Sequence, residues 1–189
     1  MGKEAPSPTH APDWVFAYGS LMWNPGFAPA EASLARLQGY RRSFCMWSIH
    51  HRGTEADPGL VLALDAEDGA GCDGMAFRMP EHGRDAVLAD LRERELISSA
   101  YVEHVVSLTL RTGSVVEALA YVIAPEHPQY CGGLALSRQA EVIAEAVGGR
   151  GPNTEYLYNT AEHLAELGIE DPELTELAAM VRERTQASP

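Results

Sequence analysis

The stretch from Trp14 to Trp23 places the strongest constraint on this chain. Its first five residues, 14–18, are apolar and uncharged, which is the pattern of a short strand buried on both faces. The run ends at Gly19-Ser20, where glycine lets a ligand approach the backbone closely and can take φ above zero, and serine adds a small hydroxyl. Successive N–H groups in such a turn can form an anion site. An ordinary strand-to-loop turn carries the same residues, so a binding turn and a structural turn both remain open.

The composition limits the class of protein and its partners. The chain has 189 residues, enough for one domain with a sizeable core, and 27 acidic against 14 basic residues give a formal charge of −13. This acidity argues against nucleic-acid and anionic membrane partners, and the apolar runs are too short to span a bilayer. We expect residues 1–12, which lack the apolar stretch of a signal peptide, to be a disordered lead-in. Residues 13–185 then form one cytoplasmic domain, a monomer or a homodimer.

The cysteines and histidines predict neither disulfides nor a metal site. Cys45, Cys72 and Cys131 are odd in number and widely spaced, which suits a reducing compartment and buried apolar roles. The adjacent His50 and His51 lack the spacing that a shared metal requires on regular structure. We therefore expect no metal and no cofactor, and a small molecule as the partner.

Strand patterns come first along the chain and helices are added around and after them. We expect strands over residues 14–18, 34–47, 60–65, 74–79, 101–110 and 115–124, with an acidic, glycine-rich turn at 66–73. Helices are expected over residues 84–95, 137–147, 153–167 and 172–184. This order predicts the α+β class with a mixed, mainly antiparallel sheet or barrel, flanking helices and a C-terminal helix.

Polar residues at helix starts predict caps. Ser137 and Asn153 can each cap a helix, and Asp171-Pro172 is a cap followed by proline at the first helical position. Earlier in the chain, Arg41 and Arg42 are adjacent in an expected strand, so their side chains point to opposite faces. One of the two is then solvated, and the other could face a pocket.

A carboxylate continues the apolar stripe of the helix over residues 84–95. Glu95 lies four residues after Leu91 and seven after Leu88, whereas Glu93 points about 200° away from Leu91. Burial and the negative end of the helix dipole should both raise the pKa of Glu95, and neighbouring arginines oppose them. A glutamate tuned in this way suits general acid–base catalysis near pH 7. An ion pair with Arg92 or another arginine is the structural alternative.

Several motifs, taken in order, resemble the ChaC-type gamma-glutamylcyclotransferases. The opening match is Tyr18-Gly19-Ser20-Leu21, with Trp14-Val15-Phe16 before it and Trp23 after it. Further matches are Gly39-Tyr40-Arg41-Arg42-Ser43-Phe44, His51-Arg52-Gly53-Thr54, Pro58-Gly59, Arg94-Glu95, and Gly151-Pro152-Asn153 with Glu155-Tyr156-Leu157. The resemblance covers residues 14–184 and implies a gamma-glutamylcyclotransferase-like fold. The chain departs from the family pattern at His50, where an acidic residue is common, and between Leu96 and Ala100, where the usual Lys and Gly are missing.

The resemblance also implies the roles of residues. It implies that Glu95 is the catalytic acid/base and that the hydroxyl of Tyr156 supports the substrate, although a core aromatic would occupy the same helix position. The implied substrate-binding set is Val15, Phe16, Ala17, Tyr18, Gly19, Ser20, Leu21 and Tyr156. The carboxylates of a peptide tail could be contacted by Arg41, Arg52 and Tyr130. Alternatively, the two arginines are solvated and the tyrosine belongs to a loop without contacting the substrate.

The implied reaction requires few catalytic groups. In a γ-glutamyl amide the α-amine attacks its own γ-carbonyl, which closes a five-membered ring and consumes no water; orientation supplies the advantage. We hypothesise cleavage of glutathione to 5-oxoproline and Cys-Gly, with Glu95 moving the proton. The alternatives are the same chemistry on another γ-glutamyl amino acid or γ-glutamylamine, a metabolite-binding protein without turnover, and a partner-binding domain that docks through its C-terminal helix.

Overall fold

Five strands form a closed barrel in the computed structural model, which describes residues 10–187. They are β1 (Trp14–Ala17), β2 (Glu31–Ser48), β3 (Gly59–Arg78), β4 (Tyr101–Leu110) and β5 (Val115–Ile123). The order around the barrel is β1-β3-β2-β4-β5, and the parallel pair β1–β5 closes it. The other neighbouring pairs are antiparallel, so the predicted mixed, mainly antiparallel sheet is confirmed.

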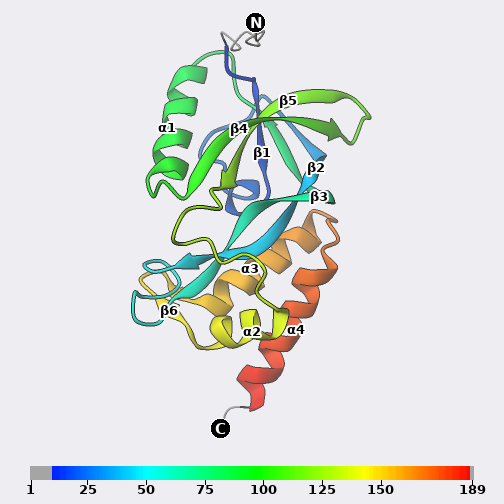
Figure 1. Ribbon diagram of the computed structural model, residues 1–189. Coiled ribbons are helices and arrows are strands. Elements are labelled where there is room, and N and C mark those ends of the chain that lie inside the picture. The colour runs from blue at the N-terminus through cyan, green and yellow to red at the C-terminus, as the bar shows by residue number, and fades with distance from the viewer. Residues whose placement is uncertain (1–9, 188–189) are drawn as a thin grey trace, which may run out of the picture.

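The prediction of two strands between residues 60 and 79 is wrong. The two segments belong to one strand, β3, which pairs with β2 from Ser48↔Gly59 to Glu31↔Arg78. The expected turn is a bulge: between the pairs Gln38↔Gly71 and Tyr40↔Ala66, β2 has one unpaired residue and β3 has four. Pairing with β2 on both sides of the bulge keeps the strand continuous, so the surplus residues bend it without ending it. Figure 1 shows this long β2–β3 ribbon running from the barrel towards the C-terminal helices.

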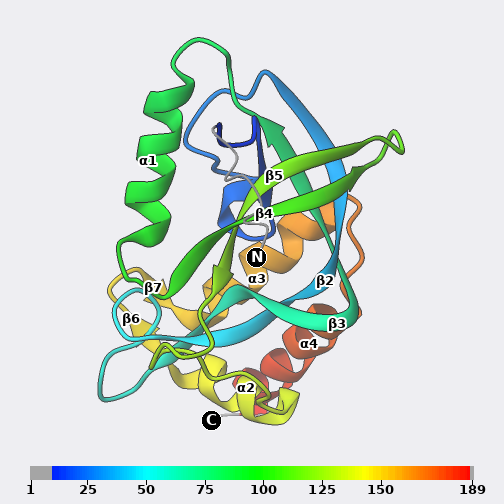
Figure 2. The same ribbon diagram turned by 45° about the horizontal axis from the view of Figure 1, so that its top comes forward.

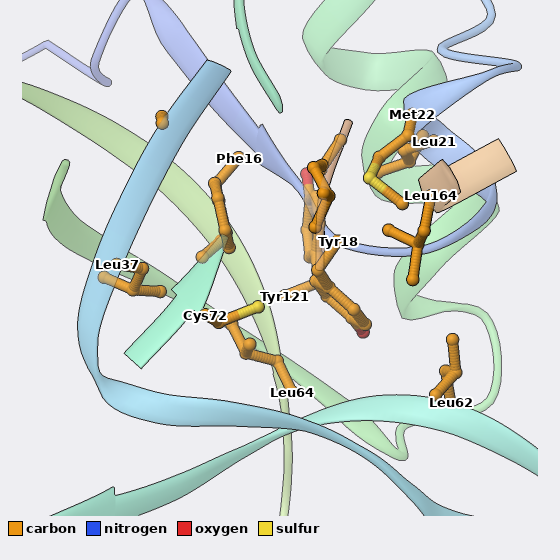
Figure 3. Close-up of a cluster of buried hydrophobic side chains, with 14 of the residues drawn as sticks. Phe16, Tyr18, Leu21, Met22, Leu37, Leu62, Leu64, Cys72, Tyr121 and Leu164 are labelled. Atoms are coloured by element: carbon orange, nitrogen blue, oxygen red, sulfur yellow. The ribbon is translucent and has the colours of Figure 1, made fainter. Parts of the chain in front are cut away.

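The side chains of β1 lie in the centre of the core. Val15, Phe16 and Ala17 are at most 1% exposed, and they pack with residues from the facing strands in one apolar cluster. Figure 3 shows Phe16 among side chains that include Leu37 of β2 and Leu64 of β3. Because Val15 and Phe16 each contribute roughly 1.5–3 kcal/mol on full burial, the run before Gly19 fixes the position of the turn that follows it.

Helices occupy two places around the barrel. The helix α1 (Arg84–Leu96) packs along β4, whereas α2 (Leu136–Glu145), α3 (Asn153–Glu166) and α4 (Pro172–Ala187) pack against one another. Figures 1 and 2 show these three helices together at the end of the β2–β3 ribbon that extends past the barrel. A two-stranded hairpin, β6 (Val147–Gly148) and β7 (Gly151–Pro152), joins α2 to α3. The predicted α+β class is confirmed.

One of the three predicted helix caps is confirmed. Asp171 Oδ1 accepts a hydrogen bond from the N–H of Leu174 at 3.0 Å, as expected for a cap. Ser137 and Asn153 do not cap, because α2 and α3 follow Ala135 and Pro152 without side-chain caps. Asn153 is fully buried and reaches across to β3: its Oδ1 accepts from Leu60 N–H at 2.7 Å and its Nδ2 donates to Leu60 O at 2.8 Å.

The buried Arg42 joins three distant parts of the chain. Its Nε donates to the carbonyl of Tyr18 at 2.6 Å, its Nη1 pairs with Asp171 Oδ2 at 3.0 Å, and its Nη2 donates to the carbonyl of Asp73. Arg41 is partly exposed and pairs with Glu67 and Glu173, so one of the two arginines is solvated, as expected, and the other is buried. The end of β1 is therefore held to β3 and to the start of α4 through one guanidinium.

The lead-in that we expect to be disordered covers residues 1–12. Its residues 1–9 lie outside the described residues. Of the rest, Ala11 and Pro12 accept hydrogen bonds through their carbonyls from Arg84 at the start of α1, the latter at 3.0 Å. None of the helices between residues 10 and 187 has the length and apolar character needed to cross a membrane.

Replacing Asn153 tests the link between α3 and β3. We expect Asn153→Ala to lower the free energy of unfolding by about 2–4 kcal/mol, since it leaves the buried N–H and C=O of Leu60 without partners. Urea unfolding measures the loss. Asn159→Ala, at an exposed position on the same helix, is the matched control. An equal loss in both variants would mean that helix propensity, and not the Leu60 contact, explains the effect.

Candidate active site

A pocket of about 390 Å³ opens where the end of β1 meets the C-terminal end of α1. Its wall also takes residues from the start of β3, from β4 and β5, from the loop after β2, from the β6–β7 hairpin and from α3. The predicted residues that reach it are Tyr18, Gly19, Ser20, Leu21, Arg52, Glu95 and Tyr156. Segments far apart in the sequence therefore supply one concave surface.

The turn after β1 presents free backbone donors. A single turn of 3-10 helix, η1 (Ser20–Met22), starts here, and Met22 N–H and Asn24 N–H donate to the carbonyls of Gly19 and Ser20. Over the described residues, the N–H groups of Ser20 and Leu21 have no acceptor, as expected at a helix start. Gly19 has φ of −136°, so a left-handed conformation is not what requires glycine. A Cβ atom there would meet nothing closer than Leu62 Cδ1 at 4.0 Å, so the glycine leaves open space.

Glu95 occupies the last turn of α1 on the inward side. Its side chain is 17% exposed and lines the pocket, whereas Glu93 is exposed to solvent. Burial raises the pKa of Glu95 above the usual range of a glutamate, and the charge of Arg94 acts in the opposite direction. The predicted inward orientation is confirmed. The predicted ion pair also exists, but with Arg94 at 3.3 Å, because Arg92 binds Glu103 with two hydrogen bonds.

Arg94 ties this carboxylate to the turn. Its Nη1 donates to the carbonyl of Asn24 at 2.8 Å and its Nη2 donates to Ser20 Oγ at 3.2 Å, while its Nε faces Glu95. One side chain thus cross-links the end of α1 to η1. The carboxylate and the free N–H groups are held at one site by this contact and by the fixing of Tyr18 through Arg42.

Four tyrosines form much of the inner wall, namely Tyr18, Tyr101, Tyr121 and Tyr156. Tyr101 donates to the carbonyl of Leu62 at 3.1 Å, and the N–H of Leu62 donates to the Tyr156 hydroxyl at 3.3 Å. Burial raises the pKa of Tyr156 to about 12 and raises those of Tyr18, Tyr101 and Tyr121 as well. The four hydroxyls are neutral at pH 7, so they act as hydrogen-bonding groups and not as bases.

Sequence reasoning missed part of this wall. Tyr101 and Tyr121 stand in expected strands, where an aromatic is ordinary; the signal available was that Tyr121 lies opposite Glu103, whose carboxylate it contacts at 3.2 Å. Arg150 was missed as well, although it directly precedes the Gly151-Pro152-Asn153 motif. The other pocket residues that had been given no role in the site are Trp23, Asn24, His51, Val61, Leu62, Arg94, Asn159 and His163.

Five of the predicted site residues lie outside the pocket. Val15, Phe16 and Ala17 point into the core, since they belong to a strand buried on both faces. Arg41 lies on the outer face of β2, with Glu67 at 3.4 Å and Glu173 at 3.5 Å. Tyr130 donates to Asp65 Oδ2 at 2.8 Å, and its backbone pairs with Met46, away from the pocket.

The described residues 10–187 contain no cluster of three or more His, Cys, Asp or Glu side chains arranged to hold a metal ion. Within the pocket, Glu95 is the acidic residue of the lining and its nearest charged partner is Arg94. The chemistry that this arrangement can perform is proton transfer by one carboxylate beside a set of backbone and hydroxyl donors.

The raised pKa of Glu95 predicts that neutralising this residue increases the stability of the fold by an amount that depends on pH. Ionisation of Glu95 destabilises the fold, so the cost is absent below the unfolded pKa of about 4.3, grows from there up to the raised folded pKa, and is constant above it. We expect the stability of Glu95→Gln relative to wild type to increase between pH 4 and pH 7, measured by urea unfolding. Exposed Glu93→Gln is the control. An equal increase there would assign the effect to net charge.

Comparison with known proteins identifies relatives over nearly the whole chain. The ChaC-like protein family matches residues 13–184. A glutathione-specific gamma-glutamylcyclotransferase of Escherichia coli (strain K12) is 36% identical over 93% of this chain and 75% of its own length. The enzyme of that name from Schizosaccharomyces pombe is 34% identical over 92% of this chain and 94% of its own.

Solved structures agree on the fold. A crystal structure of a gamma-glutamylcyclotransferase specific to glutathione from yeast superposes with a TM-score of 0.81, covering 92% of this chain and 97% of that one, at 24% sequence identity. The family match spans the barrel, the turn after β1 and the helix that carries Glu95. The chain belongs to the ChaC-like family.

Proposed function

We propose that this protein is a gamma-glutamylcyclotransferase that cleaves glutathione to 5-oxoproline and Cys-Gly. The observation that carries the proposal is that Glu95 lines one pocket with Ser20 and Leu21, whose N–H groups have no acceptor within the described residues. Relatives over 90% or more of the chain bear the name of this glutathione-specific activity. The reaction requires one proton-transferring group beside a site for anionic oxygen, and the pocket has both.

The first step is ring closure. Glu95, as the carboxylate, takes a proton from the α-ammonium of the γ-glutamyl group, and the freed amine attacks the γ-carbonyl carbon to form the new C–N bond. The carbonyl electron pair moves to the oxygen. The N–H groups at the start of η1 hold either this oxyanion or the substrate α-carboxylate, while the tyrosine hydroxyls contribute further hydrogen bonds.

The second step releases the dipeptide. Glu95 returns the proton to the nitrogen of the former amide, the carbonyl re-forms, and the bond to that nitrogen breaks. The ring nitrogen still carries one proton more than a lactam, and this proton passes through Glu95 to the released amine. The products are 5-oxoproline and an ammonium group on the dipeptide, and the carboxylate ends in its starting state. A pKa raised by burial suits both halves of this exchange, since it makes Glu95 a stronger base than a solvated glutamate while leaving it able to release the proton.

Replacing the carboxylate should abolish turnover without disturbing the site. We expect Glu95→Gln to lower kcat for glutathione by at least about 10²–10⁴-fold, because the amide cannot exchange the proton. A coupled assay for 5-oxoproline and Cys-Gly measures the loss. The matched control Glu93→Gln, two residues away on the exposed face, should keep wild-type rates. Activity retained in Glu95→Gln would exclude Glu95 as the acid/base for any γ-glutamyl substrate.

The pH profile separates the role of Glu95 from that of other groups. Activity requires the carboxylate, so the acidic limb of kcat/KM should have its midpoint above the usual glutamate pKa. Arg94→Gln removes the charge that lowers this pKa, so the midpoint should move to higher pH. Arg92→Gln, which removes the partner of Glu103, should leave it in place. A limb that moves in neither variant, or equally in both, would belong to another group.

A further inference from the structure

We infer that one side of the pocket is a subsite for the C-terminal carboxylate of the leaving dipeptide. This basic wall consists of His51, Arg52 and Arg150, from the loop after β2 and the β6–β7 hairpin. The inference rests on the proposed function and adds to it. It states which chemical feature of the leaving amine the enzyme reads, and it predicts preference for peptides with a free C-terminus over neutral γ-glutamylamines.

The charge of the pocket is opposite to that of the chain. Acidic residues outnumber basic ones 27 to 14 in the whole sequence. In the pocket lining the ratio is reversed: three arginines and two histidines face one carboxylate, Glu95, which Arg94 already accompanies. Arg52 and Arg150 therefore present positive charge with no acidic lining residue left to balance it. A substrate with two carboxylates, such as glutathione, supplies the missing negative charge.

Arg52 is held in place with part of its guanidinium unused. Its side chain is 13% exposed and lies over the ring of Tyr156, 5.7 Å from the centroid. Its Nη1 donates to the carbonyl of Pro152 at 3.1 Å and lies 3.6 Å from the exposed carboxylate of Glu155. In the described part of the chain, its Nε and Nη2 carry no hydrogen bond. These remaining donors can bind a carboxylate with little loss of side-chain freedom.

Arg150 stands next to Arg52 without an acidic partner. It is exposed, and across residues 10–187 no carboxylate lies within ion-pair distance of it. Burial and the charges of Arg150, His50 and Arg52 all lower the pKa of His51. His51 is therefore neutral at pH 7 and contributes hydrogen bonding, while the two arginines contribute the charge.

The backbone beneath the basic wall is packed too tightly to shift. A Cβ atom on Gly148 would overlap the backbone of Arg52 and Gly53, and one on Gly53 would overlap that of Gly59. Gly149 N–H donates to His50 O at 2.7 Å and Arg150 N–H to His51 O at 2.9 Å. The loop and the hairpin thus form one rigid unit, which preorganises the arginines for a ligand.

The position of this unit fits the peptide end of the substrate. The β6–β7 hairpin and the C-terminal end of α1 contribute Arg150 and Glu95 to the lining of the same pocket. The turn after β1 and Arg94 serve the γ-glutamyl half. Arg52 and Arg150, on the loop after β2 and the β6–β7 hairpin, are then available to bind the carboxylate at the far end of the substrate.

The test compares glutathione with its C-terminal glycine amide, which differs in that one charge. We expect wild type to prefer glutathione by roughly 10- to 100-fold in kcat/KM, as for a charged hydrogen-bonded contact. Arg150→Gln and Arg52→Gln should lower glutathione turnover far more than amide turnover, so that the preference falls towards one. Arg138→Gln, an exposed arginine of α2 outside the pocket, should change neither rate.

The possible failures are distinguishable. Equal turnover of both substrates by wild type would overturn the subsite and leave the proposed function standing. Equal losses on both substrates in the arginine variants would assign Arg52 and Arg150 a structural role and also overturn it. No turnover of either substrate by wild type would remove the proposed function itself. Because Arg150 is exposed, its variant keeps the test valid even if Arg52→Gln does not fold.

Discussion

The buried guanidinium of Arg42 is the interaction on which the rest of the site depends. It holds the carbonyl of Tyr18, where β1 ends, against Asp73 of β3 and Asp171 before α4. A buried ion pair of this kind is costly to break, since loss of one partner leaves an unpaired charge. Its contribution here is positional: it fixes Tyr18, directly before the turn whose residues Gly19, Ser20 and Leu21 line the pocket. Arg94 fixes the same turn from the other side, through Ser20 and Asn24.

The charge of the pocket lining differs from that of the whole chain. The surface is strongly acidic, whereas the pocket contains one partly buried carboxylate with a raised pKa and an excess of arginines. Burial raises the pKa of this carboxylate, which suits the role of base that we propose for it. The arginines suit the proposed binding of an anionic substrate. The four tyrosines stay neutral, and two of them, Tyr101 and Tyr156, bind the backbone of Leu62. The proposed mechanism therefore leaves proton transfer to Glu95. Each group therefore has one role, set by its surroundings.

Local patterns predicted much of the fold and the central residue of the site. The apolar run before Gly19, the helix that ends near Glu95 and the hairpin of β4 and β5 all follow from periodicity and turn residues. The helical stripe also indicated that Glu95 and not Glu93 points inward. The long strand β3 was not predictable, because its glycine-rich middle looks like a turn unless β2 is known to pair on both sides of it. Asn153 looked like a cap, since only the fold brings Leu60 within its reach.

The sequence by itself determined the elements, the inward carboxylate and, through ordered motifs, the family. These properties depend on residues a few positions apart in the sequence. Hydrophobic periodicity and secondary-structure propensity depend on the same short-range relations. The tertiary structure decided which of several arginines reach the pocket: Arg52 and Arg150 do, and Arg41 does not. It also assigned Val15, Phe16 and Ala17 to the core and gave Tyr101 and Tyr121 to the site. Those choices depend on how strands pair and how glycine backbones pack across a hundred residues of chain, and no local pattern carries that information.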